Sequence, residues 1–248
     1  MKVASFFSGA GGLDRGFEAA GFDIVWANEY DKTIWDTYRH NFKNTKLDTR
    51  SIVDITDSSD IPACDGMIGG PPCQSWSEAG ALRGIEDHRG QLFFEYVRLL
   101  KEKRPKFFLA ENVSGILFPR HKVAFLSILE EFSKIGYNVS YGLLNANDFG
   151  VPQDRLRVII VGYLSCFDKF FEPPRPKTSK PVLKDAIWDL RSNVLPAIGK
   201  NKSNPKVKIS NHEYMTGGFS TMFMSRNRVR PWNMPSFTIQ AGGHLPGS

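Results

Sequence analysis

The stretch VASFFSGAGGLDRGFEAAGFDIVWANEY, residues 3–30, decides the fold. An apolar run at Val3–Phe7 is followed by a glycine-rich turn, a helical pattern over Gly12–Ala20 and a second apolar run at Ile24–Asn28. A strand, a tight glycine turn, a helix and another strand make up a βαβ unit, whose strands are parallel. This stretch therefore predicts an open, mostly parallel sheet.

The alternation of short apolar runs with longer helical patterns continues to residue 163. Further strands are predicted at Gly66–Ile68, Phe107–Ala110, Ser140–Leu144 and Val158–Gly162, and further helices at Lys32–His40, Gln91–Lys101 and Val123–Ile135. This order is typical of a doubly wound α/β domain, in which helices cover both faces of one sheet. Residues 1–163 are therefore expected to form one such domain.

Residues 164–248 differ in composition, because prolines and lysines crowd residues 172–181 and polar residues fill residues 200–208. Such segments predict long irregular connections, so we expect residues 164–248 to form a second, small and irregular domain. This part has 13 Lys and Arg against 5 Asp and Glu, a net charge of +8, whereas residues 1–163 have 19 against 21, a net charge of −2. The asymmetry favours a polyanionic partner, although an ordinary basic surface would explain it as well.

The composition excludes several classes of protein. With 41% apolar residues among 248, the chain can bury a full core. No apolar run reaches the roughly 20 residues of a membrane span, and no charged leader precedes Val3–Phe7, so we expect a soluble, cytosolic protein. Because Cys64, Cys73 and Cys166 lack the paired spacing of a zinc site, we expect reduced thiols and no bound metal.

Glycines at the first strand-to-helix turn indicate a ligand-binding loop. Gly9, Ala10, Gly11 and Gly12 follow a strand and open a helix, where backbone N–H groups can approach a ligand. The spacing is G-x-G-G rather than the G-x-G-x-x-G of dinucleotide-binding proteins, which disfavours NAD. The alternatives are a nucleoside-type cofactor and an ordinary tight turn.

Acidic residues further along support the cofactor hypothesis. Glu29 follows the second strand, 20 residues beyond Gly9, where a carboxylate can accept hydrogen bonds from ribose hydroxyls, and Tyr30 beside it could stack on a purine. Asp54, followed by Ile55, could reach an adenine amino group. A solvated acid and a turn-capping Asp are the alternatives.

Cys73 stands in the most informative segment, GGPPCQSWS at residues 69–77. Two glycines and two prolines place it on a stiff loop after a strand, at the edge where open α/β sheets bind ligands. A lone cysteine is usually a small buried hydrophobic residue, but such cysteines favour element interiors over a polar loop with Gln74 and Ser75. We therefore favour Cys73 as a nucleophile.

Charged groups are expected at the same edge of the sheet. Glu111 follows the strand at Phe107–Ala110 and could donate a proton, cap a helix or form a salt bridge. Arg155 and Arg157 precede the last strand and are two residues apart, which would put them side by side on one strand face. They could bind a base carbonyl, a phosphate or Glu111.

Five segments occur in the order and spacing of conserved blocks of the DNA (cytosine-5) methyltransferases, a family that the chain resembles over residues 1 to about 243. They are residues 7–12, 28–30, 69–77, 111–113 and 153–157. Residues 71–77, 82–90 and 211–233 are especially similar to the HaeIII-type enzymes, which methylate within GGCC. The resemblance implies the Rossmann-like fold of S-adenosyl-L-methionine-dependent methyltransferases, a role in restriction-modification and GGCC as the target.

The resemblance also implies a mechanism. Cys73 would add as a thiolate to C6 of cytosine while Glu111 hydrogen-bonds or protonates N3, which makes C5 nucleophilic. Methyl transfer to C5 would leave S-adenosyl-L-homocysteine, and loss of the C5 proton with elimination of Cys73 would then restore the aromatic ring. Arg157 would hold the cytosine O2, and Arg155 would help to position Glu111 or the loop. The cytosine must be flipped out of the duplex to enter the pocket.

Further binding residues are implied in the same way. The cofactor pocket would comprise Phe7 on adenine; Gly9, Ala10, Gly11 and Gly12 at the methionine portion; Glu29 at the ribose, with Tyr30 beside it on the purine; Asp54 and Ile55 near the adenine amino group; and Pro72 and Leu92. The family's mobile loop corresponds to Gln74–Gly90, with Gln74 and Ser75 near the DNA backbone. Arg226, Arg228 and Arg230 alternate as on one extended face and could read guanines or bind phosphates.

The sequence departs from the family at its C-terminal end, where two blocks are missing. One of them normally supplies a helix and an Asn-containing loop that complete the cofactor site. We therefore expect either a truncated form or one subunit of a split enzyme, whose partner polypeptide supplies the missing part. A noncatalytic module that binds DNA or cofactor is the main alternative, and intact Cys73, Glu111 and Arg157 argue against it. A nucleotide-dependent oxidoreductase is disfavoured by the glycine spacing.

Overall fold

The computed structural model describes residues 1–72, 88–192, 194–198, 204–209, 212–214, 216 and 230–239, with the backbone alone at 88–90. The chain forms two compact units, residues 1–144 with 156–174 and residues 145–155 with 175–248. This division differs from the boundary expected near residue 164. Residues 145–155 join the second unit because Asp154 N donates to Ser236 O (2.8 Å) and Ser236 N donates to Pro152 O (2.8 Å).

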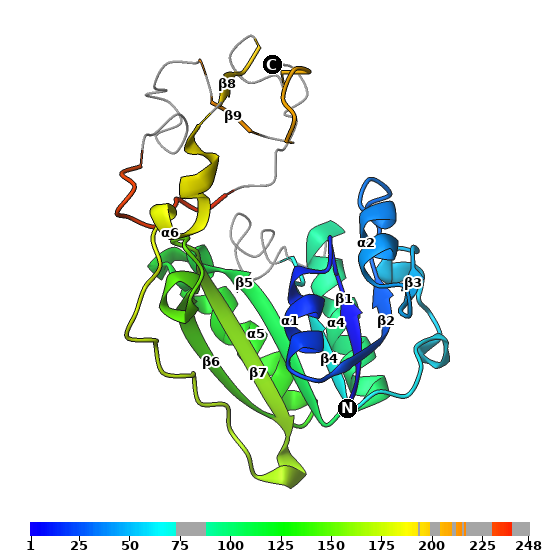
Figure 1. The fold of residues 1–248 in the computed structure, drawn as a ribbon. Helices are drawn as coiled ribbons and strands as arrows, with labels where there is room; N and C mark the ends of the chain where they lie inside the picture. Colours follow the sequence, from blue (N-terminus) through cyan, green and yellow to red (C-terminus); the bar gives the residue numbers. More distant parts are fainter. Residues whose placement is uncertain are drawn as a thin grey trace. The chain divides into compact units, whose positions relative to one another are not determined.

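A seven-stranded sheet forms the centre of the first unit, in the order β3-β2-β1-β4-β5-β7-β6 (Figure 1). Its strands are β1 (Lys2–Phe6), β2 (Asp23–Asn28), β3 (Lys46–Asp48), β4 (Gly66–Gly69), β5 (Phe107–Val113), β6 (Tyr137–Asn145) and β7 (Leu156–Leu164). Neighbouring strands from β3 to β5 are parallel, whereas β7 is antiparallel to β5. The predicted mostly parallel α/β sheet is confirmed.

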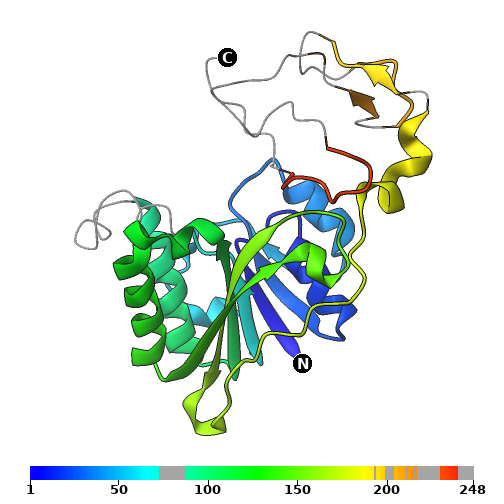
Figure 2. The ribbon, with the colours of Figure 1, turned by 90° about the vertical axis from the view of Figure 1, so that its left-hand side faces the viewer.

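The helices of this unit are α1 (Gly12–Ala19), α2 (Trp35–Asn41), α4 (His88–Lys103) and α5 (Lys122–Lys134), with short 3-10 turns η1 (Ile52–Asp54), η2 (Ser58–Asp60), η3 (Ser114–Leu117), η4 (Pro119–His121) and η6 (Ser165–Phe167). α4 and α5 cover one face of the sheet and α1 covers the other (Figure 2). α2 begins three residues later than the sequence pattern predicts. The reason is a turn in which Thr33 N donates to Asp31 Oδ1 (2.9 Å).

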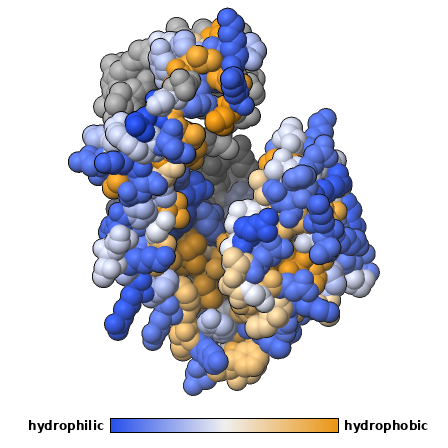
Figure 3. Space-filling model, in the orientation of Figure 1, coloured by the Kyte–Doolittle hydropathy of each residue, from blue (hydrophilic) through white to orange (hydrophobic). Residues whose placement is uncertain are grey.

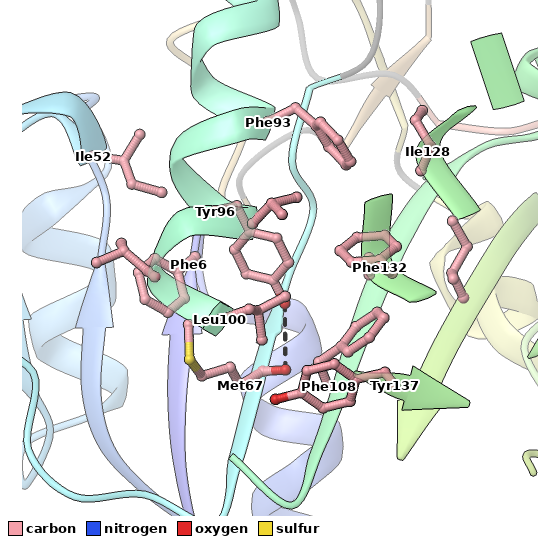
Figure 4. Close-up of a cluster of buried hydrophobic side chains, with 14 of the residues drawn as sticks. Phe6, Ile52, Met67, Phe93, Tyr96, Leu100, Phe108, Ile128, Phe132 and Tyr137 are labelled. Carbon is pink, nitrogen blue, oxygen red and sulfur yellow. Dashed lines mark hydrogen bonds between the residues drawn. The ribbon is translucent and has the colours of Figure 1, made fainter. Parts of the chain in front are cut away.

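Aromatic side chains fill the core between the sheet and helices α4 and α5 (Figure 4). The Phe108 and Phe132 ring centroids are 4.3 Å apart, and Phe6 meets Tyr96 edge-on at 5.5 Å. The Tyr96 hydroxyl donates to the Met67 carbonyl (3.3 Å), which satisfies the polar end of a fully buried ring. Burial of each such side chain contributes about 2 kcal/mol, so this layer anchors β1, β4 and β5 firmly.

The opposite face carries a second apolar cluster. Val3, on β1, packs there with Phe17 of α1, whereas its neighbour Ala4 points to the first core, because successive strand residues alternate. Beside α1 a hollow of about 450 Å³ is lined by residues such as Phe22 and Val161. Hydrophobic residues gather in this hollow on the face shown in Figure 3.

The second unit is built from short elements. They are η5 (Ala146–Phe149), α6 (Leu183–Ile187), η7 (Trp188–Arg191), β8 (Leu195–Pro196) and β9 (Glu213–Tyr214). Trp188 meets Trp232 edge-on, with ring centroids 5.2 Å apart. Among the described residues of the whole chain, no helix has the length and apolar character needed to cross a membrane.

Candidate functional site

The order of the strands reverses between β1 and β4, which creates a switch point at the centre of the sheet. Open α/β sheets bind ligands beyond the carboxyl ends of the strands at such a point. Phe6, at the end of β1, is paired with Gly69, at the end of β4, so the two loops that follow begin side by side. A Cβ at Gly69 would lie 2.7 Å from the Phe6 carbonyl oxygen, which requires glycine there.

The glycine loop after β1 is held in an unusual backbone conformation. Phe7, Gly9 and Gly11 have φ angles of 53°, 55° and 85°, in the left-handed region. A non-glycine residue in this region costs roughly 1 kcal/mol or more, and such strain clusters at functional sites. Gly12 then begins α1, so the loop leads into the first turn of a helix, as predicted from the sequence.

Glu29 is fixed by its neighbours at the end of β2. Its Oε2 accepts a hydrogen bond from Gly9 N (2.8 Å), and its Oε1 accepts one from Asp31 N (2.7 Å). The indole of Trp35, on α2, donates to the Glu29 backbone carbonyl (2.9 Å). Because each carboxylate oxygen has a further lone pair, this half-buried group can also accept from a ligand hydroxyl.

A cavity of about 440 Å³ lies beside these groups in the first unit. Five residues selected from the sequence line it, namely Phe7, Glu29, Tyr30, Asp54 and Leu92. Four lining residues were not predicted, namely Asn28, Ser51, Ile52 and Val53. The sequence could have indicated Asn28, because it is the last residue of β2. Its buried amide donates to the carbonyls of Asp48 (3.2 Å) and Arg50 (2.8 Å).

Other predicted cofactor residues lie elsewhere in the first unit. The Ile55 side chain is fully buried in the core against the sheet, so the turn before it, Ser51–Asp54, lines the cavity in its place. Ala10 and Gly12 are exposed on the glycine loop. Pro72 is half-buried and ends the described part of the loop that follows β4.

Glu111 forms an ion pair with Arg157, whose Nε lies 2.6 Å from Glu111 Oε1. The exposed fractions of the two side chains are 31% and 19%, so the pair is largely removed from solvent. Antiparallel pairing of β5 with β7 sets the contact, because it places Arg157 opposite Val113. Glu111 therefore lies within β5, whereas the sequence pattern had ended this strand at Ala110.

The same end of β5 holds the loop that leads to Cys73. A Cβ at Gly70 would lie 3.4 Å from Glu111 Oε2, so this backbone passes directly beside the carboxylate. Asn112 Nδ2 donates to the Pro71 carbonyl (3.1 Å). Glu111 and Asn112 thus border the last described residues before Cys73.

The two arginines of the predicted pair are not equivalent. β7 begins at Leu156, so Arg155 precedes the strand and belongs to the second unit, where its backbone N donates to Asn145 Oδ1 (3.0 Å). The resemblance implied that Arg155 would help to position Glu111 or the loop, and Arg157 is seen to form an ion pair with Glu111. The sequence had left this open, since both arginines could have bound Glu111.

Arg230 is engaged within the second unit. Its guanidinium pairs with Asp154 and its Nε donates to the Pro235 carbonyl (2.7 Å), while its side chain is 19% exposed. A contact of Arg230 with DNA stays a prediction. Five further predicted site residues lie outside the described residues, namely Cys73, Gln74, Ser75, Arg226 and Arg228.

The described ranges contain no cluster of three or more His, Cys, Asp or Glu residues that could hold a metal ion. Cys64 and Cys166 are free thiols, and burial raises the pKa of Cys64. A half-buried thiol of raised pKa is a poor nucleophile, and the nucleophile role of Cys73 stays a prediction.

The profile of the family described as C-5 cytosine-specific DNA methylase matches residues 1–246. The chain belongs to the C-5 cytosine-specific DNA methylase family. This confirms the family predicted from the five sequence segments. Members of this family are DNA (cytosine-5) methyltransferases. The seven-stranded sheet of this chain has their Rossmann-like fold.

Within the C-5 cytosine-specific DNA methylase family, the Type II methyltransferase M.FnuDI of Fusobacterium nucleatum is 58% identical over 247 residues, and M.NgoPII of Neisseria gonorrhoeae is 53% identical over 247 residues. Both alignments cover 98% of this chain, and 71% and 72% of those relatives. A solved structure of an E. coli prophage-encoded protein, proposed to be a DNA modification methyltransferase, superposes with a TM-score of 0.67 at 29% identity. That match covers 79% of this chain and 57% of the other. These comparisons lend no support to a second polypeptide.

Proposed function

We propose that this chain transfers a methyl group from S-adenosyl-L-methionine to C5 of a cytosine in double-stranded DNA and leaves S-adenosyl-L-homocysteine. The observation that carries the proposal is the ion pair of Glu111 with Arg157 beside Gly70–Pro72, the backbone that leads to Cys73. An acid held by an arginine next to a nucleophile-bearing loop suits covalent catalysis. Membership of the family supports the same reaction.

The cavity of about 440 Å³ has the size and lining that suit S-adenosyl-L-methionine. When bound, this cofactor supplies an electrophilic methyl group. In the proposed arrangement Phe7 and Tyr30 contact the adenine, Glu29 accepts from the ribose hydroxyls, Asp54 accepts from the adenine amino group, and Leu92 and Pro72 add apolar walls. The strained loop Gly9–Gly12 presents its backbone to the methionine portion, with Ile55 supporting the pocket from the core.

Cys73 provides the covalent step in this proposal. Its thiolate forms a bond to C6, while Glu111 donates a hydrogen bond or a proton to N3 and draws electrons from the ring. The electron pair displaced from the 5,6 double bond makes C5 nucleophilic, and C5 gains the methyl group. Removal of the C5 proton then re-forms the double bond and expels the Cys73 thiolate.

Arg157 orients the acid and can hold the base. Its Nε is bound to Glu111 and its Nη1 donates to the Leu156 carbonyl (2.8 Å), while Nη2 suits a carbonyl oxygen such as cytosine O2. Arg155, which directly precedes β7, is proposed to help position Glu111 or the loop.

DNA is bound in the proposal with the target cytosine flipped out of the duplex. Gln74 and Ser75 contact the backbone near the flipped nucleotide, and Arg226, Arg228 and Arg230 contact phosphates or guanines. The net charge of +8 on residues 164–248 favours this polyanion. The proposed target is GGCC, and the proposed role is protection of prokaryotic DNA in a restriction-modification system.

A trapping experiment tests the covalent mechanism. Duplex DNA with 5-fluorocytosine within GGCC is incubated with the chain and S-adenosyl-L-methionine, and covalent complexes are separated by denaturing electrophoresis. Because fluorine at C5 cannot leave as a proton would, the adduct should accumulate with the parent chain and be absent with Cys73→Ser. Cys166→Ser removes an exposed thiol and should leave the yield unchanged. No adduct with the parent chain would contradict the proposal, and DNA binding without methyl transfer would favour the noncatalytic module.

The target sequence is tested separately. Genomic DNA from cells that express the chain is sequenced for 5-methylcytosine. Methylation confined to GGCC is expected, and methylation at another sequence would reject that target while leaving the reaction intact.

A further inference from the structure

A buried polar network connects α1 with α2 beneath the glycine loop. The Ser5 hydroxyl donates to Asp14 Oδ1 and the Tyr38 hydroxyl donates to Asp14 Oδ2, both at 2.6 Å. Asp14 and Tyr38 are fully buried, and Ser5 is nearly so. A carboxyl group removed from water is costly unless its oxygens have partners, so the three residues depend on one another.

The network continues into the glycine loop itself. The Ser8 hydroxyl donates to Ser5 Oγ (3.0 Å), and Ser8 N donates to the carbonyl of Asn28, at the end of β2 (3.1 Å). Ser8 directly precedes Gly9 and stands between two residues with left-handed backbone, Phe7 and Gly9. The hydrogen bonds that begin at Asp14 therefore reach the strained part of the loop.

Phe42, the residue that follows α2, also packs directly against this loop. Phe42 stacks on Tyr38 with ring centroids 4.6 Å apart and an interplanar angle of 22°. A Cβ at Gly11 would lie 2.0 Å from Phe42 Cε2, so only glycine allows the ring this close. The position of Tyr38 thereby sets the position of an aromatic wall under Gly11.

The first turn of α2 makes the third connection. Trp35 holds the Glu29 carbonyl, and the Glu29 carboxylate accepts from Gly9 N. Helix α2 is thus bound at two places: Tyr38 donates to Asp14, and Trp35 donates to Glu29, whose carboxylate is bound to the loop. Displacement of α2 would move both the loop and the carboxylate proposed to bind ribose.

We propose that Asp14 and Tyr38 are positioning residues for the methyl donor, which clamp α2 against the glycine loop so that Gly9–Gly11 and Glu29 keep their binding geometry. This inference rests on the proposed function, because it takes the adjoining cavity to be the S-adenosyl-L-methionine site. Neither side chain is among the residues that line that cavity, so both act through others. An apolar pair of the same volume would fill the space as stably as a buried carboxyl and hydroxyl, which favours geometry as the reason for these residue types.

Binding measurements on two matched tyrosine variants test the inference. Tyr38→Phe removes only the hydroxyl that donates to Asp14. Tyr137→Phe is the control, because it removes an equivalent hydroxyl from another buried tyrosine, whose partner is the Pro105 carbonyl (2.9 Å). Calorimetric titration with S-adenosyl-L-methionine gives the Kd of each protein, and thermal unfolding shows that each is folded at the temperature used.

Tyr38→Phe should weaken binding about 5- to 10-fold, whereas Tyr137→Phe should change the Kd by less than about 2-fold. Asp14→Asn should weaken binding in the same range, and the double variant with Tyr38→Phe should bind no more weakly than the weaker single variant, since both remove the same clamp. Equal Kd values for the parent and Tyr38→Phe would overturn the inference, as would equal losses in Tyr38→Phe and Tyr137→Phe. A parent chain that binds no S-adenosyl-L-methionine would instead contradict the proposed cofactor.

Discussion

Arg157 Nε and Glu111 Oε1 are 2.6 Å apart, and this contact fixes the direction in which the carboxyl group points. The other carboxyl oxygen, Oε2, faces the backbone at Gly70. A charge-assisted hydrogen bond from a guanidinium is about twice as strong as one between neutral groups. Glu111 is therefore presented with one oxygen restrained and one directed toward the loop that leads to Cys73.

Glu111→Gln and Arg157→Ala should each slow formation of the Cys73 adduct by about 10²-fold or more, because each removes the oriented acid. The double variant should be no slower than the slower single variant, since groups that act as a unit are not additive. Rates of adduct formation on 5-fluorocytosine DNA provide the measurement. Lys134→Ala, which breaks an exposed pair with Glu131 on α5, is the control and should be neutral. Multiplicative losses in the double variant would show that the two residues act independently.

Asn112→Ala should slow the adduct about 10-fold without changing the Kd for S-adenosyl-L-methionine. The variant loses the hydrogen bond to the Pro71 carbonyl. The loop that leads to Cys73 is then less restrained, so the thiolate is less often positioned for attack. Asn44→Ala, at an exposed turn after α2, serves as the control for both measurements. A weaker Kd in Asn112→Ala would mean that the residue supports the cofactor cavity instead.

Gly11→Ala and Gly16→Ala should have opposite effects on stability. At Gly11 the new methyl group would meet Phe42 Cε2 at 2.0 Å in a left-handed backbone, so the free energy of unfolding should fall by about 2 kcal/mol or more. At Gly16, exposed within α1 and open to a Cβ, alanine should raise it by roughly 0.5 to 1 kcal/mol. Urea unfolding measures both. If Gly11→Ala left the free energy of unfolding unchanged, α2 could move away from the loop at little cost, which would contradict the proposed clamp.

The pH dependence of stability should report on Asp14. Burial raises the pKa of this carboxyl group, and the nearby Glu18 adds to the rise, while hydrogen bonds from Ser5 and Tyr38 oppose it. Between the ordinary pKa of Asp and the raised pKa of Asp14, the folded state holds a proton that the unfolded state has lost. The contribution of Asp14 to the free energy of unfolding therefore falls as the pH rises through this range. Urea unfolding of the parent and Asp14→Asn across this range should show the parent losing its relative stability with rising pH. If the parent instead gained stability relative to Asp14→Asn with rising pH, the raised pKa of Asp14 would be contradicted.

Local patterns in the sequence predicted the sheet well. Strands β1, β2 and β7 lie within about two residues of their apolar runs, because strands inside a sheet with helices on both faces are largely apolar. β3 was missed, since Lys46–Asp48 is three residues long and begins with an exposed lysine. The glycine loop and Glu29 could be found because their roles depend on neighbours within one βαβ unit.

The pairing across β5 and β7 could not be predicted in the same way. Antiparallel register places Arg157 opposite Val113 and so beside Glu111, and two positions of equal parity look identical in a strand pattern. Likewise the backbone of the turn Ile52–Asp54 directs Val53 toward the cavity, whereas Ile55, the residue after the turn, lies in the core. Both depend on contacts between segments far apart in the chain.

Residues 145–155 leave the first unit and the chain re-enters it at Leu156, so the backbone passes between the units three times. No single cleavage point can release either unit as one continuous piece. An exchange of the whole second unit between relatives would therefore need two transplants, one for the connection between β6 and β7 and one for the chain after Pro174. A chimera joined only after Pro174 would separate Asp154 from the Arg230 with which it is paired.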